Sequence, residues 1–343
     1  MKKSLLIFLC YILYPTFVKA QDPIFTQFSL IPEALNPAFT GIANTWNAGI
    51  LHRSQWPDAN RKIETQFGFV NNLITNELGL GITILNNHEN FTNYNYSQFN
   101  GVFSYRIHLD DKWRLGLGIE GGLGRKDFKF NNLLFEDQIN INNGSISSNS
   151  NDAILINGND KINFFDLSVG FEIDQENTWF GASLKHLTRP NISFINGNNV
   201  PLDMFLSVHG GYFFELNNSP SLIFPENTTI HVMGNYMRQG QSNRLDIGSS
   251  LEFPRFSFGA TITTNPEGRS DNSQLVSSIN PFASFKAGEF TFGYSYDLNS
   301  SKLGNGNGIH ELTLTWQSSY TCSRCDNYKV KLKRNGEPGY ERN

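Results

Sequence analysis

The dominant pattern in this chain is alternation of apolar positions with polar or glycine positions. In Trp113–Glu120 the odd positions are Trp, Leu, Leu and Ile, and the even positions are Arg, Gly, Gly and Glu. The same period of two runs through Phe165–Glu172, Leu245–Phe253 and Phe290–Tyr296. This period places one set of side chains on each face of a β-strand. An apolar face opposite a polar face is typical of a strand between lipid and the lumen of a membrane barrel.

Fourteen such segments approach the length of about ten residues that a tilted membrane-spanning strand needs. They are Trp46–Gln55, Lys62–Asn71, Leu78–Asn86, Tyr96–Leu109, Trp113–Gly124, Asn163–Ile173, Thr178–Leu187, Asp203–Leu216, Thr228–Arg238, Asn243–Phe253, Arg255–Thr264, Gln274–Phe285, Glu289–Asp297 and Ile309–Gln317. Short connections mostly alternate with longer polar ones such as Arg125–Ile162, as periplasmic turns and external loops do. The sequence therefore predicts an all-β fold, a transmembrane antiparallel β-barrel of about 14 strands over residues 46–317, with both ends on the periplasmic side.

Residues 1–20 have the pattern of a secretory signal peptide. Two lysines precede an apolar run that ends at Phe17, and a small-residue cleavage pattern ends at Ala20. The run is too short for a membrane helix, and Pro15 interrupts it. The mature chain is expected to begin near Gln21. Its formal charge falls from −4 to −7, because the signal peptide carries three lysines and no acid.

Two further segments lie outside the strand pattern. In residues 21–45, Pro23, Pro32 and Pro37 remove ladder donors, so we expect a plug-like segment folded into or under the lumen. Residues 318–343 are expected to form a periplasmic C-terminal tail. This tail holds Cys322 and Cys325, the only cysteines of the mature chain. A lone C-x-x-C supports zinc weakly, and a small structural disulfide suits an oxidising periplasm.

No catalytic constellation stands out. The chain has no H-E-x-x-H, G-x-S-x-G or P-loop motif, so no catalytic residue, cofactor or metal site is predicted. The acidic mature chain argues against nucleic acid as a partner. Charged residues recur at inward positions of the strands, and we interpret them as a lattice of lumen ion pairs, with the acid–base pair of an outer-membrane hydrolase as the alternative. They are Arg53, Arg106, Arg114, Glu120, Asp166, Glu172, Lys185, Asp246, Glu252 and Glu311.

Aromatic residues are abundant, with 29 Phe and 12 Tyr, although the mean hydropathy is −0.35. A membrane barrel reconciles the two values because only every second strand residue faces lipid; a secreted β-sandwich or solenoid is the alternative. All five tryptophans fall near predicted strand ends and are expected to form an aromatic girdle at the membrane surface. They are Trp46, Trp56, Trp113, Trp179 and Trp316.

Several short motifs, taken in order, resemble a known family. They are Gln21–Phe28, Leu35–Gly41 (LNPAFTG), Arg53–Trp56, Phe180–Leu187, Gly293–Asp297 and His310–Trp316. Together they resemble the PorP/SprF family of type IX secretion system outer-membrane proteins over roughly Gln21 to Trp316. The resemblance implies a barrel similar in plan to the long-chain fatty-acid transporters, located in the bacterial outer membrane and in contact with its lipid.

The resemblance also implies a function. Family members work with the type IX secretion machinery of Bacteroidota in the export and surface retention of large adhesins, which carry a family-specific C-terminal domain and drive movement in gliding species. The expected partners are the cargo's C-terminal domain and periplasmic and outer-membrane secretion components. The alternatives are a channel for hydrophobic or small solutes and an outer-membrane hydrolase.

Three places are expected to contact cargo or partner proteins. The first is Phe128, Phe130 and Phe135 in the longest external loop. The second is Asn36 and Pro37 in the N-terminal motif. The third is the tail, where Tyr328, Lys331 and Lys333 lie in an alternating basic segment. That segment could add as a strand to a partner's sheet edge, or it could be a solvated basic tail.

Overall fold

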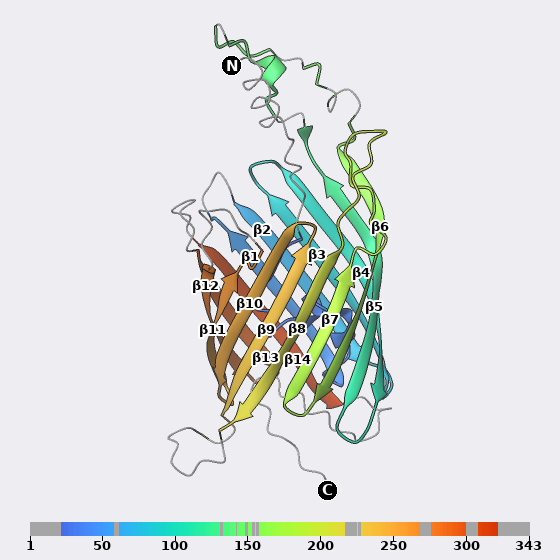
Figure 1. The fold of residues 1–343 in the computed structure, drawn as a ribbon, viewed down its shortest axis with the longest axis vertical. Helices are drawn as coiled ribbons and strands as arrows, with labels where there is room; N and C mark the ends of the chain where they lie inside the picture. Colours follow the sequence, from blue (N-terminus) through green and yellow to red (C-terminus); the bar gives the residue numbers. More distant parts are fainter. Residues whose placement is uncertain are drawn as a thin grey trace, which may run out of the picture.

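The protein is a closed antiparallel β-barrel of fourteen strands (Figure 1). The computed structural model describes residues 22–57, 62–130, 133–141, 143–147, 150–152, 155, 158–216, 225, 228–267, 276–299 and 308–321. The strands are β1 (Thr45–Gln55), β2 (Ile63–Leu73), β3 (Leu78–Glu89), β4 (Tyr94–His108), β5 (Arg114–Asp127), β6 (Lys161–Gln175), β7 (Thr178–Lys185), β8 (Phe205–Glu215), β9 (Thr229–Gln239), β10 (Ser242–Glu252), β11 (Phe256–Thr264), β12 (Val276–Ala287), β13 (Phe290–Asn299) and β14 (Ile309–Thr321). All fourteen predicted strands are confirmed, and the last runs beyond the predicted end at Gln317.

The barrel closes where β1 pairs with β14. Thr45 at the start of β1 pairs with Thr321 at the end of β14. The chain therefore enters and leaves the barrel on the same side, as predicted. Every strand pairs with two neighbours, and this satisfies the backbone without an open edge, as a structure that spans lipid requires. Most of the short connections, such as the one between Gln175 and Thr178, lie at the same end of the barrel as Thr45, but the two-residue turn between Gln239 and Ser242 lies at the opposite end.

The alternation of the sequence becomes an apolar outer face and a largely polar inner face. Ile50, Phe99, Ile119, Phe258 and Leu312 are among the exposed outward side chains. The ten predicted inward charges do point inward: nine are buried, and Lys185 is half-buried. No helix among the described residues is long and apolar enough to cross a membrane.

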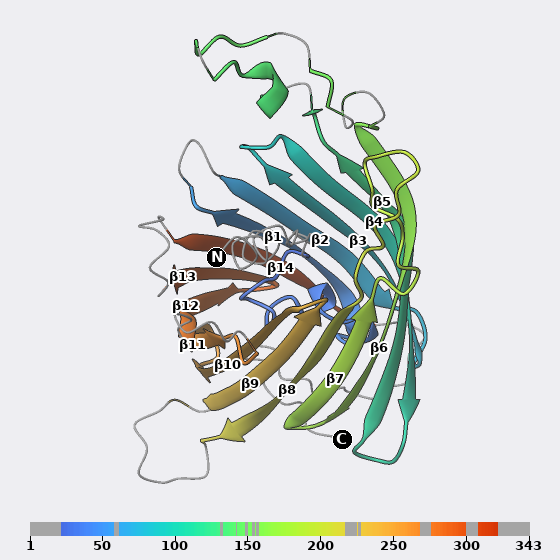
Figure 2. The same ribbon diagram turned by 45° about the horizontal axis from the view of Figure 1, so that its top comes forward.

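One side of the barrel is taller than the other. Strands β4, β5 and β6 have 15, 14 and 15 residues, whereas β7 has eight. The long strands rise beyond the rest of the rim, and the loop that joins β5 to β6 projects above them (Figures 1 and 2). This loop contains the short 3₁₀ helix η4 (Glu136–Gln138). The external end of the barrel is therefore asymmetric.

Residues 22–44, here called the inner segment, lie inside the barrel (Figure 2). The segment contains two single-turn 3₁₀ helices, η1 (Pro32–Ala34) and η2 (Pro37–Phe39), each beginning with a proline that needs no helical N–H partner. Asp22, at the start of the inner segment, contacts His186, which follows the external end of β7. Asn44, at the other end of the segment, contacts Arg106 near the periplasmic end of β4. The segment therefore runs the length of the lumen.

One tryptophan prediction is wrong. Trp46 and Trp56 are exposed on the outer surface, at 50% and 39%, but Trp179 is only 8% exposed and points into the lumen. There it packs against Phe39, with ring centroids 5.8 Å apart. Trp179 lies near a strand end, as predicted, but on the inward face of β7. The predicted signal peptide, both cysteines, Tyr328, Lys331 and Lys333 lie outside the described residues.

The two orientations of tryptophan can be tested in lipid. In single-tryptophan variants reconstituted with brominated lipids, Trp46 fluorescence should be strongly quenched, because its ring contacts acyl chains. Trp179 fluorescence should change little, because the barrel wall separates its ring from lipid. Equal quenching of the two variants would contradict the inward position of Trp179.

Candidate functional site: the filled lumen

Asn36, which is fully buried, attaches the second half of the inner segment to the barrel wall. Its side-chain oxygen accepts the Ala38 N–H at 2.9 Å and so caps η2. Its amide nitrogen donates to the carbonyl of Phe171 on β6 at 2.8 Å and lies 3.1 Å from His209 Nε2 on β8. One amide therefore stabilises the turn and binds it to the barrel wall.

Glycines on the wall make room for this turn. A Cβ at Gly118 on β5 would overlap the backbone of Pro37 and Ala38, and a Cβ at Gly170 on β6 would overlap the Asn36 side chain. Any other residue at these two positions would hold the turn away from the strands. The glycine face seen in the sequence of β5 is thus a seat for the LNPAFTG motif.

On the opposite wall, a buried carboxylate takes the same role. The Glu33 side chain accepts hydrogen bonds from Asn47 Nδ2 on β1 at 2.9 Å and from Asn71 Nδ2 on β2 at 3.1 Å. The Asn71 side-chain oxygen accepts the Gly41 N–H at 3.1 Å. A buried carboxylate is costly unless it is hydrogen-bonded, so the amides of Asn47 and Asn71 are needed to stabilise the buried Glu33 carboxylate.

Apolar packing joins the inner segment to wall residues that would otherwise face an open lumen. Phe25, Leu30, Ile31 and Ala34 form one buried cluster with three wall side chains. Those three are Leu51, Phe67 and Phe69. Phe28 and Leu35 form a second cluster with Met233 and Phe282. Burial of one large apolar side chain stabilises by about 1.5–3 kcal/mol. The contents of this lumen resemble a protein core.

At the external end, an ionic clasp holds the start of the segment. His186 Nε2 lies 2.6 Å from Asp22 Oδ2, and His186 Nδ1 lies 2.5 Å from Asp166 Oδ2. Burial alone would lower the pKa of His186, but the two carboxylates outweigh it and raise that pKa to about 9. Burial opposes the shift at Asp22 too, but His186 lowers the pKa of the Asp22 carboxyl to about 2. The clasp therefore carries charge across the neutral pH range.

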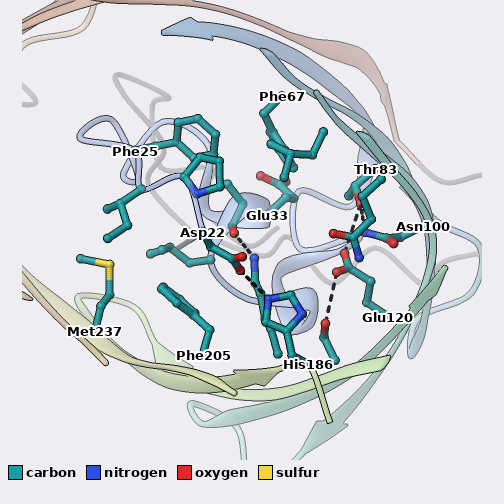
Figure 3. A pocket seen from close by; sticks show the side chains of 18 residues that line it. Asp22, Phe25, Glu33, Phe67, Thr83, Asn100, Glu120, His186, Phe205 and Met237 are labelled. Carbon is teal, nitrogen blue, oxygen red and sulfur yellow. Dashed lines mark hydrogen bonds and ion pairs between the residues drawn. The ribbon is translucent and has the colours of Figure 1, made fainter. Parts of the chain in front are cut away.

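A small cavity with both polar and apolar lining residues remains between the first half of the inner segment and the wall (Figure 3). Asp22, Phe25 and Glu33 line it from the segment, and Thr83, Asn100, Glu120 and His186 face it from the wall. Its volume of about 40 Å³ accommodates only a few waters, since each needs roughly 10–15 Å³. Among the described residues no group of His, Cys, Asp or Glu is arranged to hold a metal ion.

The residues expected to contact cargo or partners fall into two environments. Asn36 and Pro37 are buried and bind the chain's own barrel wall, so they have no surface to offer a partner. Phe128 and Phe130 pack against each other and against Phe194 of the β7–β8 loop, with centroids 4.5–5.9 Å apart. Phe130 is 5% exposed, so this group organises the loops. Phe135 is half-buried beside η4.

Sequence reasoning missed the exposed residues of the projecting loop. Leu134, Ile141 and Ile146 are 52%, 87% and 64% exposed, and a bridge between Ile139 and Ile146 closes a small hairpin. Contiguous exposed apolar patches, unlike single exposed side chains, mark interaction sites. In the sequence, Ile141 and Ile146 stand out only as isoleucines within a stretch rich in Asn, Ser and Gly.

A closed fourteen-stranded barrel with an apolar outer face is an outer-membrane β-barrel protein. The family model described as type IX secretion system membrane protein PorP/SprF matches residues 17–316. The chain belongs to this family and is an outer-membrane component of type IX secretion.

Solved outer-membrane barrels are similar to the chain at low sequence identity. Omp33 of Acinetobacter baumannii is 7% identical with a TM-score of 0.43, over 80% of this chain and 100% of its own. A Pseudomonas aeruginosa FadL homologue is 8% identical with a TM-score of 0.42, over 82% of this chain and 92% of its own. The TodX monoaromatic hydrocarbon channel mutant is 8% identical with a TM-score of 0.48, over 83% and 93%. No curated protein sequence matches the chain.

The glycine seat can be tested by filling it. Gly118→Val should displace Pro37 and Ala38, because overpacking costs about 1–3 kcal/mol, and chymotrypsin should then cleave the inner segment near Phe28 or Phe39. Gly101→Val is the matched control, because a Cβ there would meet only a backbone oxygen at 4.0 Å. Equal protection of the two variants would show that the seat is not required.

The clasp predicts a pH dependence of stability. The pKa of His186 rises from 6.5 to about 9 on folding, so its contribution is complete below pH 6.5 and is lost as the pH rises through 9. The pKa of Asp22 falls from 3.8 to about 2, so its contribution is lost as the pH falls through 2. The difference in unfolding free energy between wild type and His186→Gln should be largest between pH 4 and 6.5. A difference that stays constant up to pH 9.5 would exclude the ionic clasp.

Proposed function

We propose that this protein retains large adhesin-type cargo at the cell surface during type IX secretion, and that its barrel is a sealed membrane anchor. The observation that carries the proposal is the filled lumen. Asn36, Glu33 and Asp22 bind the inner segment to the wall along its length, and apolar clusters lie between these points. Movement of cargo through this lumen would require loss of that packing.

The same packing weighs against the solute-channel alternative. Withdrawal of the inner segment would expose Phe67, Phe69 and Met233 to water together with their partners on the segment. Each large side chain costs about 1.5–3 kcal/mol when it is returned to water. A channel that cycles between open and closed states needs a smaller free-energy difference between those two states.

The role is also proposed to be non-enzymatic. His186 is the most strongly engaged histidine of the lumen, but both its ring nitrogens face carboxylates. A general base needs a nitrogen that can take a proton from a nucleophile. In this arrangement Asp22 and Asp166 occupy both nitrogens, and the histidine acts as a clasp.

Cargo contact is best supported at the projecting loop above the tall side of the barrel (Figure 2). Ile141 and Ile146 are exposed there, beyond the membrane-facing strands. We propose that cargo, through its C-terminal domain, binds these apolar side chains. The aromatic group Phe128, Phe130 and Phe194 sets the position of the loop.

The proposal predicts a selective loss at the cell surface. Ile141→Ser combined with Ile146→Ser should reduce one or a few large surface proteins several-fold and raise them in the medium, because the apolar contacts are lost while the barrel is untouched. Mass spectrometry of surface and secreted fractions, beside a gene deletion, measures this. Phe91→Ser is the matched control, since Phe91 is 73% exposed on the neighbouring β3–β4 loop.

Two outcomes would contradict the proposal. If the gene deletion leaves all large surface proteins in place, the role in retention is wrong. If the purified protein conducts ions or small solutes steadily across planar bilayers, the barrel is a channel.

A further inference from the structure

The seam where the barrel closes carries a buried charge cluster. Arg53 on β1 stands directly opposite Glu311 on β14 in the register of the seam. Its guanidinium contacts the Glu311 carboxylate and lies 3.3 Å from Asp297 Oδ2 on β13. The three side chains are at most 4% exposed. One cation therefore serves two neighbouring carboxylates.

The inner segment supplies the remaining partners of these carboxylates. The Thr26 N–H donates to both Glu311 oxygens at 2.9 and 3.1 Å, and the Gln27 N–H donates to Oε2 at 3.0 Å. The Thr26 hydroxyl donates to both Asp297 oxygens at 2.9 and 3.0 Å. Gln27 Nε2 donates to the Glu311 backbone carbonyl at 3.0 Å. Two residues of the segment thus contact both final strands.

When the inner segment fills the lumen, these donors are needed at the seam. Without them, the two buried carboxylates on β13 and β14 would be left with the Arg53 guanidinium and with the charge of Arg244, which is itself paired with Asp246 at 2.9 Å. Like charges in a low-dielectric site repel, and a buried charge that lacks its hydrogen bonds is strongly destabilising. Hydrogen bonds from backbone N–H groups to a carboxylate are among the stronger kinds.

We propose that Asp297 and Glu311 form a binding site for the Thr26–Gln27 part of the inner segment, and that this site couples barrel closure to lumen filling. In a barrel that has not taken up its inner segment, water fills the lumen and weakens the ion pair of Arg53 with the two carboxylates, so β1 is held less firmly to β14. Insertion of Thr26 and Gln27 excludes this water and supplies donors to both carboxylates, and the strands close around a filled lumen. An empty, leaky barrel is thereby disfavoured in the outer membrane.

A disulfide across the seam reports closure. Ser54 and His310 pair across β1 and β14 on the outward face. Opposed Cβ atoms of paired strands lie about 4.5–5.5 Å apart, close to disulfide range. Ser54→Cys and His310→Cys are placed in the full chain with Cys322 and Cys325 replaced by serine. The yield of the seam disulfide and of the faster-migrating unheated band is followed during synthesis in cells.

Thr26→Val should lower the early yield of both signals several-fold, because Asp297 loses its hydroxyl donor. Adding Asp297→Asn should restore the yield, because the buried carboxylate that lacks its donor is then replaced by a neutral amide. Thr65→Val is the matched control, a buried lumen threonine that donates to Asn87 and not to the seam. Unchanged closure in Thr26→Val, or no recovery with Asp297→Asn, would overturn the coupling.

A second chain variant keeps the test decisive if single changes are too mild. Deletion of residues 24–43 should lower the yield of the seam disulfide at least as far as Thr26→Val does, and Asp297→Asn should give no recovery in that deletion, because no segment is present to bury the carboxylate. A deletion variant that closes as efficiently as the full chain would show that the seam does not depend on the inner segment.

Discussion

Closure of the backbone hydrogen-bond ring is the constraint on which the rest of this structure depends. A strand that spans lipid must satisfy every N–H and C=O within the sheet, and only a closed barrel does so without an edge. Closure creates an interior, and the inward positions of fourteen strands must then be occupied. Here they are filled by charged and amide side chains and by the chain's own N-terminal residues. Closure of the strand ring and packing of the lumen therefore depend on each other during folding.

The filling is built from three kinds of contact that differ in range. The glycine seat at Gly118 and Gly170 is steric and acts only at contact. Buried amides and carboxylates, such as Asn36 and Glu33, fix orientation through hydrogen bonds. Charged groups act over longer distances and hold the external half of the inner segment: His186 pairs with Asp22, and the carboxylates beside Arg53 accept hydrogen bonds from Thr26. Ion pairs thus act on the inner segment over the longer range, and hydrogen bonds and close packing fix its final position.

The strands could be predicted from the sequence because the period of two is local. The alternation within each strand indicates which side chains face lipid and which face the lumen. The inward charges followed from the same period. The direction of Trp179 did not, because a lumen with an apolar filling accepts a tryptophan as readily as lipid does. The contact of Asp22 with His186 joins residues 164 positions apart, and no local pattern encodes it. The burial of Asn36 required knowledge of which glycines face it.

The apolar lumen side chains also bear on strand register. On most strands a slip of one residue would turn polar side chains toward lipid and would be penalised at once. On β2, Phe67 and Phe69 point inward while Val70 points outward, so lipid alone discriminates weakly between the two faces in this stretch. The packing of Phe25 onto Phe67, with ring centroids 5.8 Å apart, distinguishes the two alignments. The N-terminal residues thus act as an internal template that selects the alignment of the strands around them.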